Sequence, residues 1–248
     1  MNDFGTALNG HFYAIGVGPG AADLLTVRAV NLIRGAHTII APRSERADES
    51  QSRLAIAPYL NGQEVIDHAY PMRRDEEATM RCWQAMADVI VARCRAGQAV
   101  VQITLGDPLL YSTSCYLIDL VRAALSDAQV HVVPGISAFQ AAACRFAEPI
   151  TLQEDRLVLM SATDLDAVER ALDECETLVL YKCGKKLADL VRLFERRGLA
   201  GQLRVACYVE QDGRQALLTD PQAIAAYDSG YMATMIVHVS RRKWQAPA

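Results

Sequence analysis

Apolar and polar positions follow two different periods in the first half of the chain. Four compact apolar runs have the length of buried strands: HFYAIGV (11–17), HTIIAP (37–42), AVVQITL (99–105) and VHVVPG (130–135). Between them, apolar residues recur every three or four positions, which is typical of amphipathic helices at 27–36, 75–96 and 116–125. Thr26 is expected to cap the first helix. This alternation of strand and helix predicts a largely parallel sheet.

The pattern lapses around FAEPITLQED (146–155), where we expect a domain boundary near residue 149. Beyond it, Thr163 and Asp166 are spaced like a capping box at a helix start. The segment DGRQALLTDP (212–221) resembles a hairpin rather than a helix. We therefore expect a second α/β domain with a mixed sheet, with the two domains at 10–149 and 154–243. Its strands are expected at RLVLMSAT (156–163), ETLVLYKCG (176–184), LRVACYVE (203–210) and MATMIVHVS (232–240).

Composition narrows the class of protein. The 248 residues are 51% hydrophobic and 22% charged, which is ordinary for a globular protein. A net charge of −4 provides no general attraction for nucleic acid or an anionic membrane. No apolar run approaches the roughly 18 residues that a membrane span needs, and MNDFGTALNG has no apolar leader core. We expect a cytoplasmic protein that binds neither nucleic acid nor a membrane.

The cysteines and histidines show no spacing of a metal site or a disulfide framework. We expect the cysteines to be small buried apolar residues in a reducing compartment. The five histidines are equally dispersed, and no metal is predicted. The seven cysteines are at positions 82, 94, 115, 144, 175, 183 and 207.

The turn GVGPG at 16–20 allows two interpretations. Gly16, Gly18 and Ala21 satisfy the permissive pattern of a dinucleotide-binding turn. In that fold, however, the helix opens on the turn itself, whereas here PGAADLL precedes Thr26. Pro19 also removes a backbone N–H donor. The next strand ends in APRS instead of an acidic residue, although Arg43 could bind a 2′-phosphate. An NADP-dependent oxidoreductase therefore stays open as an alternative.

Two further loops of small residues follow predicted strands, LGDP at 105–108 and the PGISA part of VPGISAF (133–139). The carboxyl ends of parallel strands lie at one edge of a sheet, where ligands bind. The three loops, at 16–20, 105–108 and 134–138, are thus expected to converge on one site. In the second loop, Asp107 brings an acceptor and Gly106 allows close backbone approach.

Over nearly the whole chain these motifs resemble the tetrapyrrole (corrin/porphyrin) methyltransferase family. GHFYAIGVGPGAADLLTVRAVNLIRGAHTIIAP, LGDPLLYSTSCYL and LVLMSAT are most similar to the branch that methylates C-20 of precorrin-2 or cobalt-factor II on the route to cobalamin. The resemblance implies two α/β domains that bind S-adenosylmethionine (SAM) in the cleft between them, and a homodimer. The chain departs from the family pattern at AAD, where Asp-Pro is common, and at Ser137-Ala138, where Ser-Ser is common.

The resemblance also implies a set of SAM-binding positions. In the first domain these are Pro19, Leu105, Gly106, Asp107, Leu110, Thr113, Ser114, Ser137 and Ala138. In the second domain they are Met160, Lys182, Cys183, Glu210, Gln211, Ala233 and Thr234, the last two at the adenine. Asp107 and Tyr111 are the candidate catalytic residues; an Asp107 that only caps its own turn is the simpler alternative.

A tetrapyrrole with many carboxylates needs local cations, and guanidinium groups suit carboxylates. The candidates are Arg43, Arg46, Arg53, Arg73 and Arg74. Methyl transfer from a sulfonium to carbon needs alignment of donor and acceptor more than a charged triad. Methylation at another corrin carbon, or of a protein or RNA base, and a non-catalytic tetrapyrrole carrier remain as alternatives.

Overall fold

The computed structural model describes residues 5–44, 50–70, 76–228 and 232–240. The chain divides into two compact units, Met1–Ser137 and Ala138–Ala248. One unit contains an all-parallel sheet and the other a mixed sheet, which confirms the predicted fold class.

The first unit is built on five parallel strands in the order β3-β2-β4-β1-β5. Parallel pairing places the carboxyl ends of the adjacent strands β4, β1 and β5 at one edge, as the sequence predicted. The strands are β1 (Phe12–Gly16), β2 (Thr38–Ser44), β3 (Glu64–Tyr70), β4 (Val100–Thr104) and β5 (Val130–Val133).

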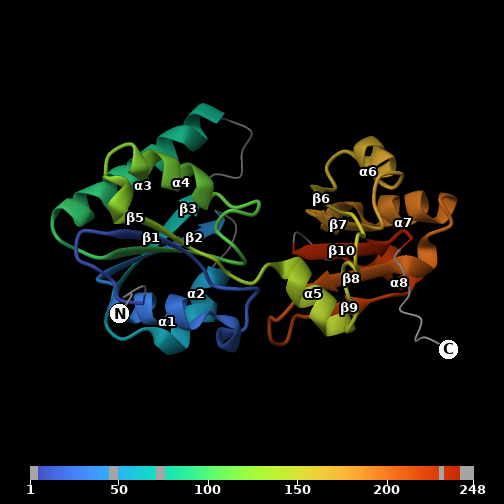
Figure 1. Ribbon diagram of the computed structural model, residues 1–248, viewed down its shortest axis with the longest axis horizontal. Coiled ribbons are helices and arrows are strands. Elements are labelled where there is room, and N and C mark those ends of the chain that lie inside the picture. Colours follow the sequence, from blue (N-terminus) through green and yellow to red (C-terminus); the bar gives the residue numbers. More distant parts are fainter. Residues whose placement is uncertain (1–4, 45–49, 71–75, 229–231, 241–248) are drawn as a thin grey trace. The chain divides into compact units, whose positions relative to one another are not determined.

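Helices cover both faces of this sheet (Figure 1). Helices α1 (Val27–Gly35) and α2 (Gln51–Ile56) pack on one face, and α3 (Glu76–Arg95) and α4 (Ser114–Arg122) on the other. Thr26 caps α1 as expected, since its Oγ1 accepts a hydrogen bond from Ala29 N at 3.2 Å. The short 3-10 turns of this unit are Ala22–Leu24, Ala57–Tyr59 and Asp127–Gln129.

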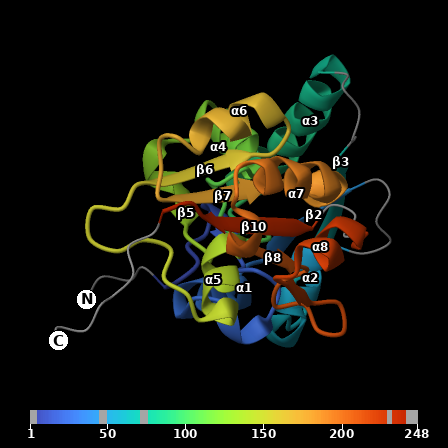
Figure 2. The ribbon, with the colours of Figure 1, turned by 90° about the vertical axis from the view of Figure 1, so that its right-hand side faces the viewer.

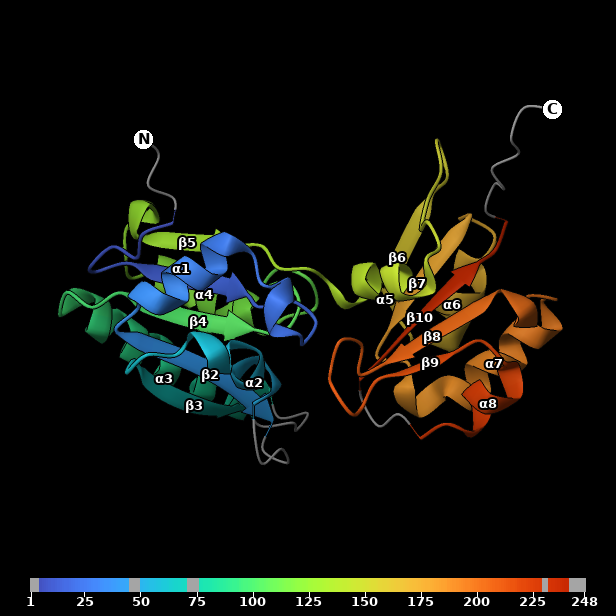
Figure 3. The ribbon, with the colours of Figure 1, turned by 90° about the horizontal axis from the view of Figure 1, so that it is seen from below.

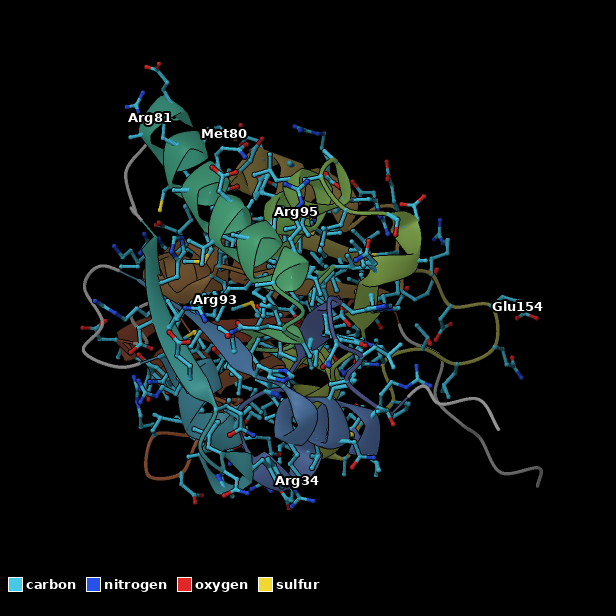
Figure 4. All side chains as sticks on the ribbon, turned by 90° about the vertical axis from the view of Figure 1, so that its left-hand side faces the viewer. Arg34, Met80, Arg81, Arg93, Arg95 and Glu154 are labelled. Atoms are coloured by element: carbon cyan, nitrogen blue, oxygen red, sulfur yellow. The ribbon has the colours of Figure 1, made fainter. Side chains whose placement is uncertain are left out.

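Two side-chain contacts attach α3 to its neighbours. The ring of Trp83 stacks on Tyr116 of α4, with ring centres 3.9 Å apart and planes 8° from parallel. Near the C-terminal end of α3, Arg93, which is labelled in Figure 4, donates to both carboxylate oxygens of Glu64 and to Thr38 Oγ1. The long helix is thereby held in its first half and near its C-terminal end.

The second unit contains a mixed sheet in the order β6-β7-β10-β8-β9. Strands β6 and β7 are parallel, and the remaining neighbours are antiparallel. The segment 212–221, expected to form a hairpin, supplies only strand β9, which pairs with the preceding strand β8, and helix α8 (Pro221–Ala226) follows closely. The strands are β6 (Leu157–Ser161), β7 (Thr177–Tyr181), β8 (Leu203–Cys207), β9 (Ala216–Leu218) and β10 (Ala233–His238).

Helices α6 (Leu165–Ala171), α7 (Leu187–Arg196) and α8 share one core with the second sheet. Helix α5 (Ala138–Phe146) packs on β8 and β10 (Figures 2 and 3). Because α5 buries its alanines in this unit, the compact units separate at Ser137 and Ala138. The boundary expected near 149, and with it the range 10–149, differs from this division. The 3-10 turns here are Gly184–Lys186 and Ala200–Gln202.

Local details differ from the sequence analysis in two places. Asp164, not Thr163, caps α6, because its carboxylate accepts from Ala167 N at 3.1 Å. Cys144 is exposed, and Cys82 and Cys115 are partly exposed, whereas the other four cysteines are buried as expected. In the described part of the chain, no helix has both the length and the apolar composition of a membrane span.

Candidate functional site

The three small-residue loops of the first unit meet through their main chains. Gly18 and Gly106 form an isolated antiparallel bridge in which Gly106 N donates to Gly18 O at 2.6 Å and Gly18 N to Gly106 O at 3.3 Å. Val17 N also donates to Thr104 O at 2.9 Å. The expected convergence of the loops after β1 and β4 is therefore a direct backbone contact.

Glycine is required where these loops approach most closely. A β-carbon on Gly16 would lie 2.5 Å from the Gly106 carbonyl oxygen and 2.6 Å from Gly135 N. A β-carbon on Gly135 would come closer still to the same oxygen. Sequence reasoning did not place Gly16 and Gly135 among the site residues, although both belong to the predicted loops. The feature of the sequence that could have identified them is a glycine at the end of a buried strand or shortly after it.

Asp107 joins two of the loops. Its Oδ1 accepts from Leu109 N at 2.9 Å, and its Oδ2 accepts from Gly135 N at 3.1 Å. The first bond is the turn cap that the sequence allowed, and the second ties the loop after β4 to the loop after β5. Both carboxylate oxygens thus have backbone donors, so Asp107 acts as a tether.

The loop from Leu105 to Thr113 is held at its far end by side chains below it. Gln102 Nε2 donates to Ser114 Oγ at 2.9 Å, and Thr104 Oγ1 lies 3.1 Å from Ser112 Oγ. Ser114 is fully buried, so its hydroxyl serves α4 and the sheet instead of facing solvent. Gln102 was missed by the sequence analysis, although a glutamine inside the apolar run AVVQITL was a signal.

The other predicted positions of the first unit lie on the same loops. Pro19 is buried beside the glycine bridge, and Leu105 and Leu110 are partly buried. Thr113 is the N-cap residue of α4, but its side chain makes no capping bond. Ser137 is buried and ends the first unit, whereas Ala138 begins α5. Tyr111 is 47% exposed and has a left-handed backbone with φ of 52°.

The second unit brings its own predicted residues to one edge of its sheet. Met160 lies on β6, Lys182 and Cys183 follow β7, Glu210 and Gln211 follow β8, and Ala233 and Thr234 begin β10. The strand register places the start of β10 beside the ends of β7 and β8, because Ala233 pairs with Cys207 and Met235 with Leu180. Cys183 Sγ donates to Ala233 O at 3.2 Å.

This edge of the second sheet carries backbone strain and an unpaired polar atom. Lys182, Tyr208 and Glu210 have φ of 58°, 48° and 58°, a conformation that costs free energy in residues other than glycine and occurs preferentially at functional sites. Among the described residues, Gln211 Oε1 is buried without a hydrogen-bond partner.

The surroundings of two predicted side chains at this edge can be described. Burial raises the pKa of the Cys183 thiol to about 12, so this thiol stays protonated and is no nucleophile. The Glu210 carboxylate pairs with Arg145 of α5 at 3.7 Å.

The structure describes two of the five predicted substrate-binding arginines. Arg43 lies near the end of β2 and is partly buried. Arg53 on α2 pairs with Asp67 of β3 at 2.7 Å, and both side chains are about two-fifths exposed. Arg46, Arg73 and Arg74 lie outside the described residues. The structure therefore leaves the carboxylate-binding role of all five as a prediction.

The glycine turn lacks the geometry of a dinucleotide cradle. After the turn the chain forms a 3-10 turn at Ala22–Leu24, and α1 begins only at Val27. The N-terminus of α1 thus does not open on the glycines, as a pyrophosphate site requires. Among the described residues, no group of three or more His, Cys, Asp or Glu side chains could hold a metal ion.

Comparison with known proteins gives one consistent family. Residues 11–219 match the family described as Tetrapyrrole (Corrin/Porphyrin) Methylases. A Salmonella typhimurium protein named cobalt-precorrin-2 C(20)-methyltransferase is 32% identical over 194 residues, which cover 77% of this chain and 81% of that protein. A Sinorhizobium protein named precorrin-2 C(20)-methyltransferase is 28% identical and covers 92% of this chain and 95% of its own.

Solved structures show the same fold. Cobalt precorrin-4 methyltransferase aligns with a TM-score of 0.70 at 20% identity, over 92% of this chain and 95% of that one. A uroporphyrin-III C-methyltransferase from Thermus thermophilus, complexed with S-adenosyl homocysteine, aligns with a TM-score of 0.62 at 21% identity, over 92% and 96%. The chain belongs to the tetrapyrrole (corrin/porphyrin) methylase family.

Proposed function

We propose that this protein transfers a methyl group from SAM to C-20 of precorrin-2 or cobalt-factor II in cobalamin biosynthesis. The main support is the place where three glycine-containing loops meet, at the carboxyl ends of β4, β1 and β5. The relatives of the chain that bear the names of C-20 methyltransferases are the second support. No separate observation favours another corrin carbon, an oxidoreductase or a carrier.

The residues at this edge fit a donor that is recognised mainly by backbone and shape. A β-carbon on Gly106 would meet no atom within 4 Å, so the main chain here is open to a ligand. Gly16 and Gly135 have no such room and instead pack the loops together. When bound, SAM supplies an electrophilic methyl group on a sulfonium.

The chain's own contribution is placement. The Gly18–Gly106 bridge and the Asp107–Gly135 bond fix the three loops before any ligand binds. Loops fixed in this way can hold the methyl donor and the acceptor in line. Such alignment can lower the activation free energy of a displacement by roughly 7–11 kcal/mol at best. The adenine contacts of the second unit, at Ala233 and Thr234, are proposed on the family resemblance alone.

The central test is incubation with SAM and either precorrin-2 or cobalt-factor II, followed by mass and NMR assignment of the methylated carbon. A methyl group at C-20 is expected. A product methylated at another position would show that C-20 is not the acceptor carbon. A complete absence of methyl transfer would overturn the proposed activity.

A first prediction concerns the donor site. Gly106→Arg should abolish calorimetric binding of S-adenosylhomocysteine, because its side chain enters the open space above the loop. Gly62→Arg is the matched control, since Gly62 also has a positive φ, at 84°, and open surroundings but lies at the turn before β3. Unchanged binding by Gly106→Arg would show that the donor binds elsewhere.

We further propose a cytoplasmic homodimer. All seven cysteines are free thiols, which supports a reducing compartment, and the dimer rests on the family resemblance. Light scattering of the purified protein should give twice the 27.2 kDa chain mass.

A further inference from the structure

The loop between β4 and α4 is anchored at both ends by different kinds of contact. At its start, Gly106 bridges to Gly18, and Asp107 accepts from Gly135 N. At its end, Ser112 and Ser114 bond to the side chains of Thr104 and Gln102 on β4. Ser112 Oγ also accepts from Ser114 N at 3.1 Å, which fixes the start of α4.

The end anchor is built from buried polar groups. Gln102 and Ser114 are both fully buried, and Thr104 is nearly so. Buried polar groups are costly unless they are paired, so a glutamine within a central strand of an apolar sheet requires a partner. Gln102 Nε2 finds this partner in Ser114 of the helix that follows the loop, whereas Gln102 Oε1 is buried without a hydrogen-bond partner among the described residues. The bonds from Gln102 and Thr104 fix the position of the loop's end relative to β4.

Between the two anchors, the loop holds two large apolar side chains toward solvent. Leu109 is 60% exposed and Tyr111 is 47% exposed. Tyr111 also adopts a left-handed backbone, which a tyrosine rarely takes unless its surroundings enforce it. An anchored loop that displays a leucine and a strained tyrosine beside the glycine junction is suited to contact a flat apolar surface.

We propose that Leu109 and Tyr111 form the surface on which the tetrapyrrole ring packs, and that Gln102 and Thr104 are positioning residues that hold this surface. This inference rests on the proposed function, which supplies the ring as the acceptor. A macrocycle presents a broad apolar face whose contact with a leucine and an aromatic ring is favourable. Leu109 and Tyr111 follow Gly106 on the same loop, three and five residues later, so the surface adjoins the proposed donor site.

The surface itself is tested by Leu109→Ala, with Leu217→Ala on β9 as a matched change at another exposed leucine. Absorbance titration with cobalt-factor II should show affinity reduced about tenfold by Leu109→Ala and unchanged by Leu217→Ala. Affinity for S-adenosylhomocysteine should stay within twofold for both. Equal cobalt-factor II affinity in Leu109→Ala and the wild type would contradict the proposal that Leu109 contacts the tetrapyrrole ring.

The role of the Tyr111 ring is tested by two substitutions. Tyr111→Phe keeps the aromatic face and should keep cobalt-factor II affinity. Tyr111→Asn, which tolerates the left-handed backbone, should lose about tenfold. If Tyr111→Asn binds like Tyr111→Phe, the ring makes no contact and this part is wrong.

The positioning role is tested by a pair of changes at Thr104. Thr104→Val keeps the shape but removes the hydroxyl, whereas Thr104→Ser keeps the hydroxyl and should rescue binding. We expect Thr104→Val to raise KM for the tetrapyrrole about five- to tenfold with kcat less affected, and Thr104→Ser to resemble the wild type. Equal KM values in the two variants would overturn the role.

The titration separates this inference from the proposed function. A wild type that binds cobalt-factor II through Leu109 but transfers no methyl to C-20 contradicts the proposed reaction and supports the surface. A wild type that methylates C-20, together with an unaffected Leu109→Ala, supports the reaction and overturns the surface. Absence of any tetrapyrrole binding overturns both.

Discussion

The most constrained residues in this protein have no side chain. Gly16 and Gly135 are packed against the carbonyl oxygen of Gly106, so one added carbon at either position collides with backbone. The strained non-glycine residues at the edge of the second sheet form a second constrained group, at Lys182, Tyr208 and Glu210. At the residue scale, the candidate site is therefore constrained by backbone geometry more than by contacts of reactive side chains.

Gly135→Ala should lower the free energy of unfolding by about 1–3 kcal/mol, because the added methyl group forces the loops apart. It should also weaken S-adenosylhomocysteine binding strongly. Urea denaturation and calorimetry measure the two effects. Gly201→Ala is the control, since a β-carbon there meets no atom within 4 Å. Equal free energies of unfolding in the two variants would mean that the loops accommodate the added methyl group without loss of stability.

Asp107→Asn distinguishes a tether from a base. The amide retains one acceptor oxygen but directs an NH₂ group at either Leu109 N or Gly135 N. A tether predicts a Kd for S-adenosylhomocysteine that rises about five- to tenfold. A base predicts an unchanged Kd and a loss of kcat alone.

Part of the residue-scale site could be predicted from the sequence. The glycine loops, Asp107 as acceptor and Thr26 as cap followed from local patterns. The second bond of Asp107, to Gly135, joins residues far apart in the chain and has no local signal. The burial of Ser114 depends on what packs over it, which a single sequence does not specify.

At the scale of elements, α5 is attached to its sheet by an ionic cluster. Glu148, just beyond the helix, accepts from Arg204 of β8 at 2.8–2.9 Å and pairs with His238 of β10 at 2.8 Å. Burial raises the pKa of the Glu148 carboxyl, but the Arg204 and His238 contacts outweigh burial and leave this pKa below its usual value. The cluster thus favours the ionised carboxylate in the folded protein.

Glu148→Gln should lower the free energy of unfolding by about 1–3 kcal/mol at pH 7. Because the folded-state pKa is depressed, the carboxylate's contribution is complete above its unfolded pKa of about 4.5 and is lost as the pH falls through the folded value. The gap between wild type and variant should therefore narrow below pH 4.5 in urea titrations. A gap that is constant with pH would exclude an ionic contribution.

Elements were predicted where their apolar pattern was strong. Helix α3 and strands β1, β4, β7 and β10 have long apolar or periodic stretches and were found. Strand β3 was missed, because EVIDHAY lies at the sheet edge and mixes charged with apolar positions. The short helix α2 was missed as well, since six residues show too little periodicity.

For the whole molecule, the two units have separate hydrophobic cores, and α5 lies in the second unit, packed on β8 and β10. The sequence placed the boundary later because the apolar pattern fails only after α5. Fragments 1–137 and 138–248 should therefore each fold. Circular dichroism and solubility measure this.

A cut after residue 149 provides the comparison. It removes α5 from the sheet face formed by β8 and β10, so fragment 150–248 should aggregate. If that fragment is as soluble and as folded as 138–248, the packing of α5 contributes nothing to the second unit.

The stack of Trp83 on Tyr116 gives the protein a built-in optical sensor. Tyr116 lies in the first turn of α4, close to Ser114, where the anchored loop ends. The chain has two tryptophans, and the other, Trp244, lies outside the described residues. In a Trp244→Phe background, the emission of Trp83 would report any displacement of α4 as ligands bind, without an attached dye.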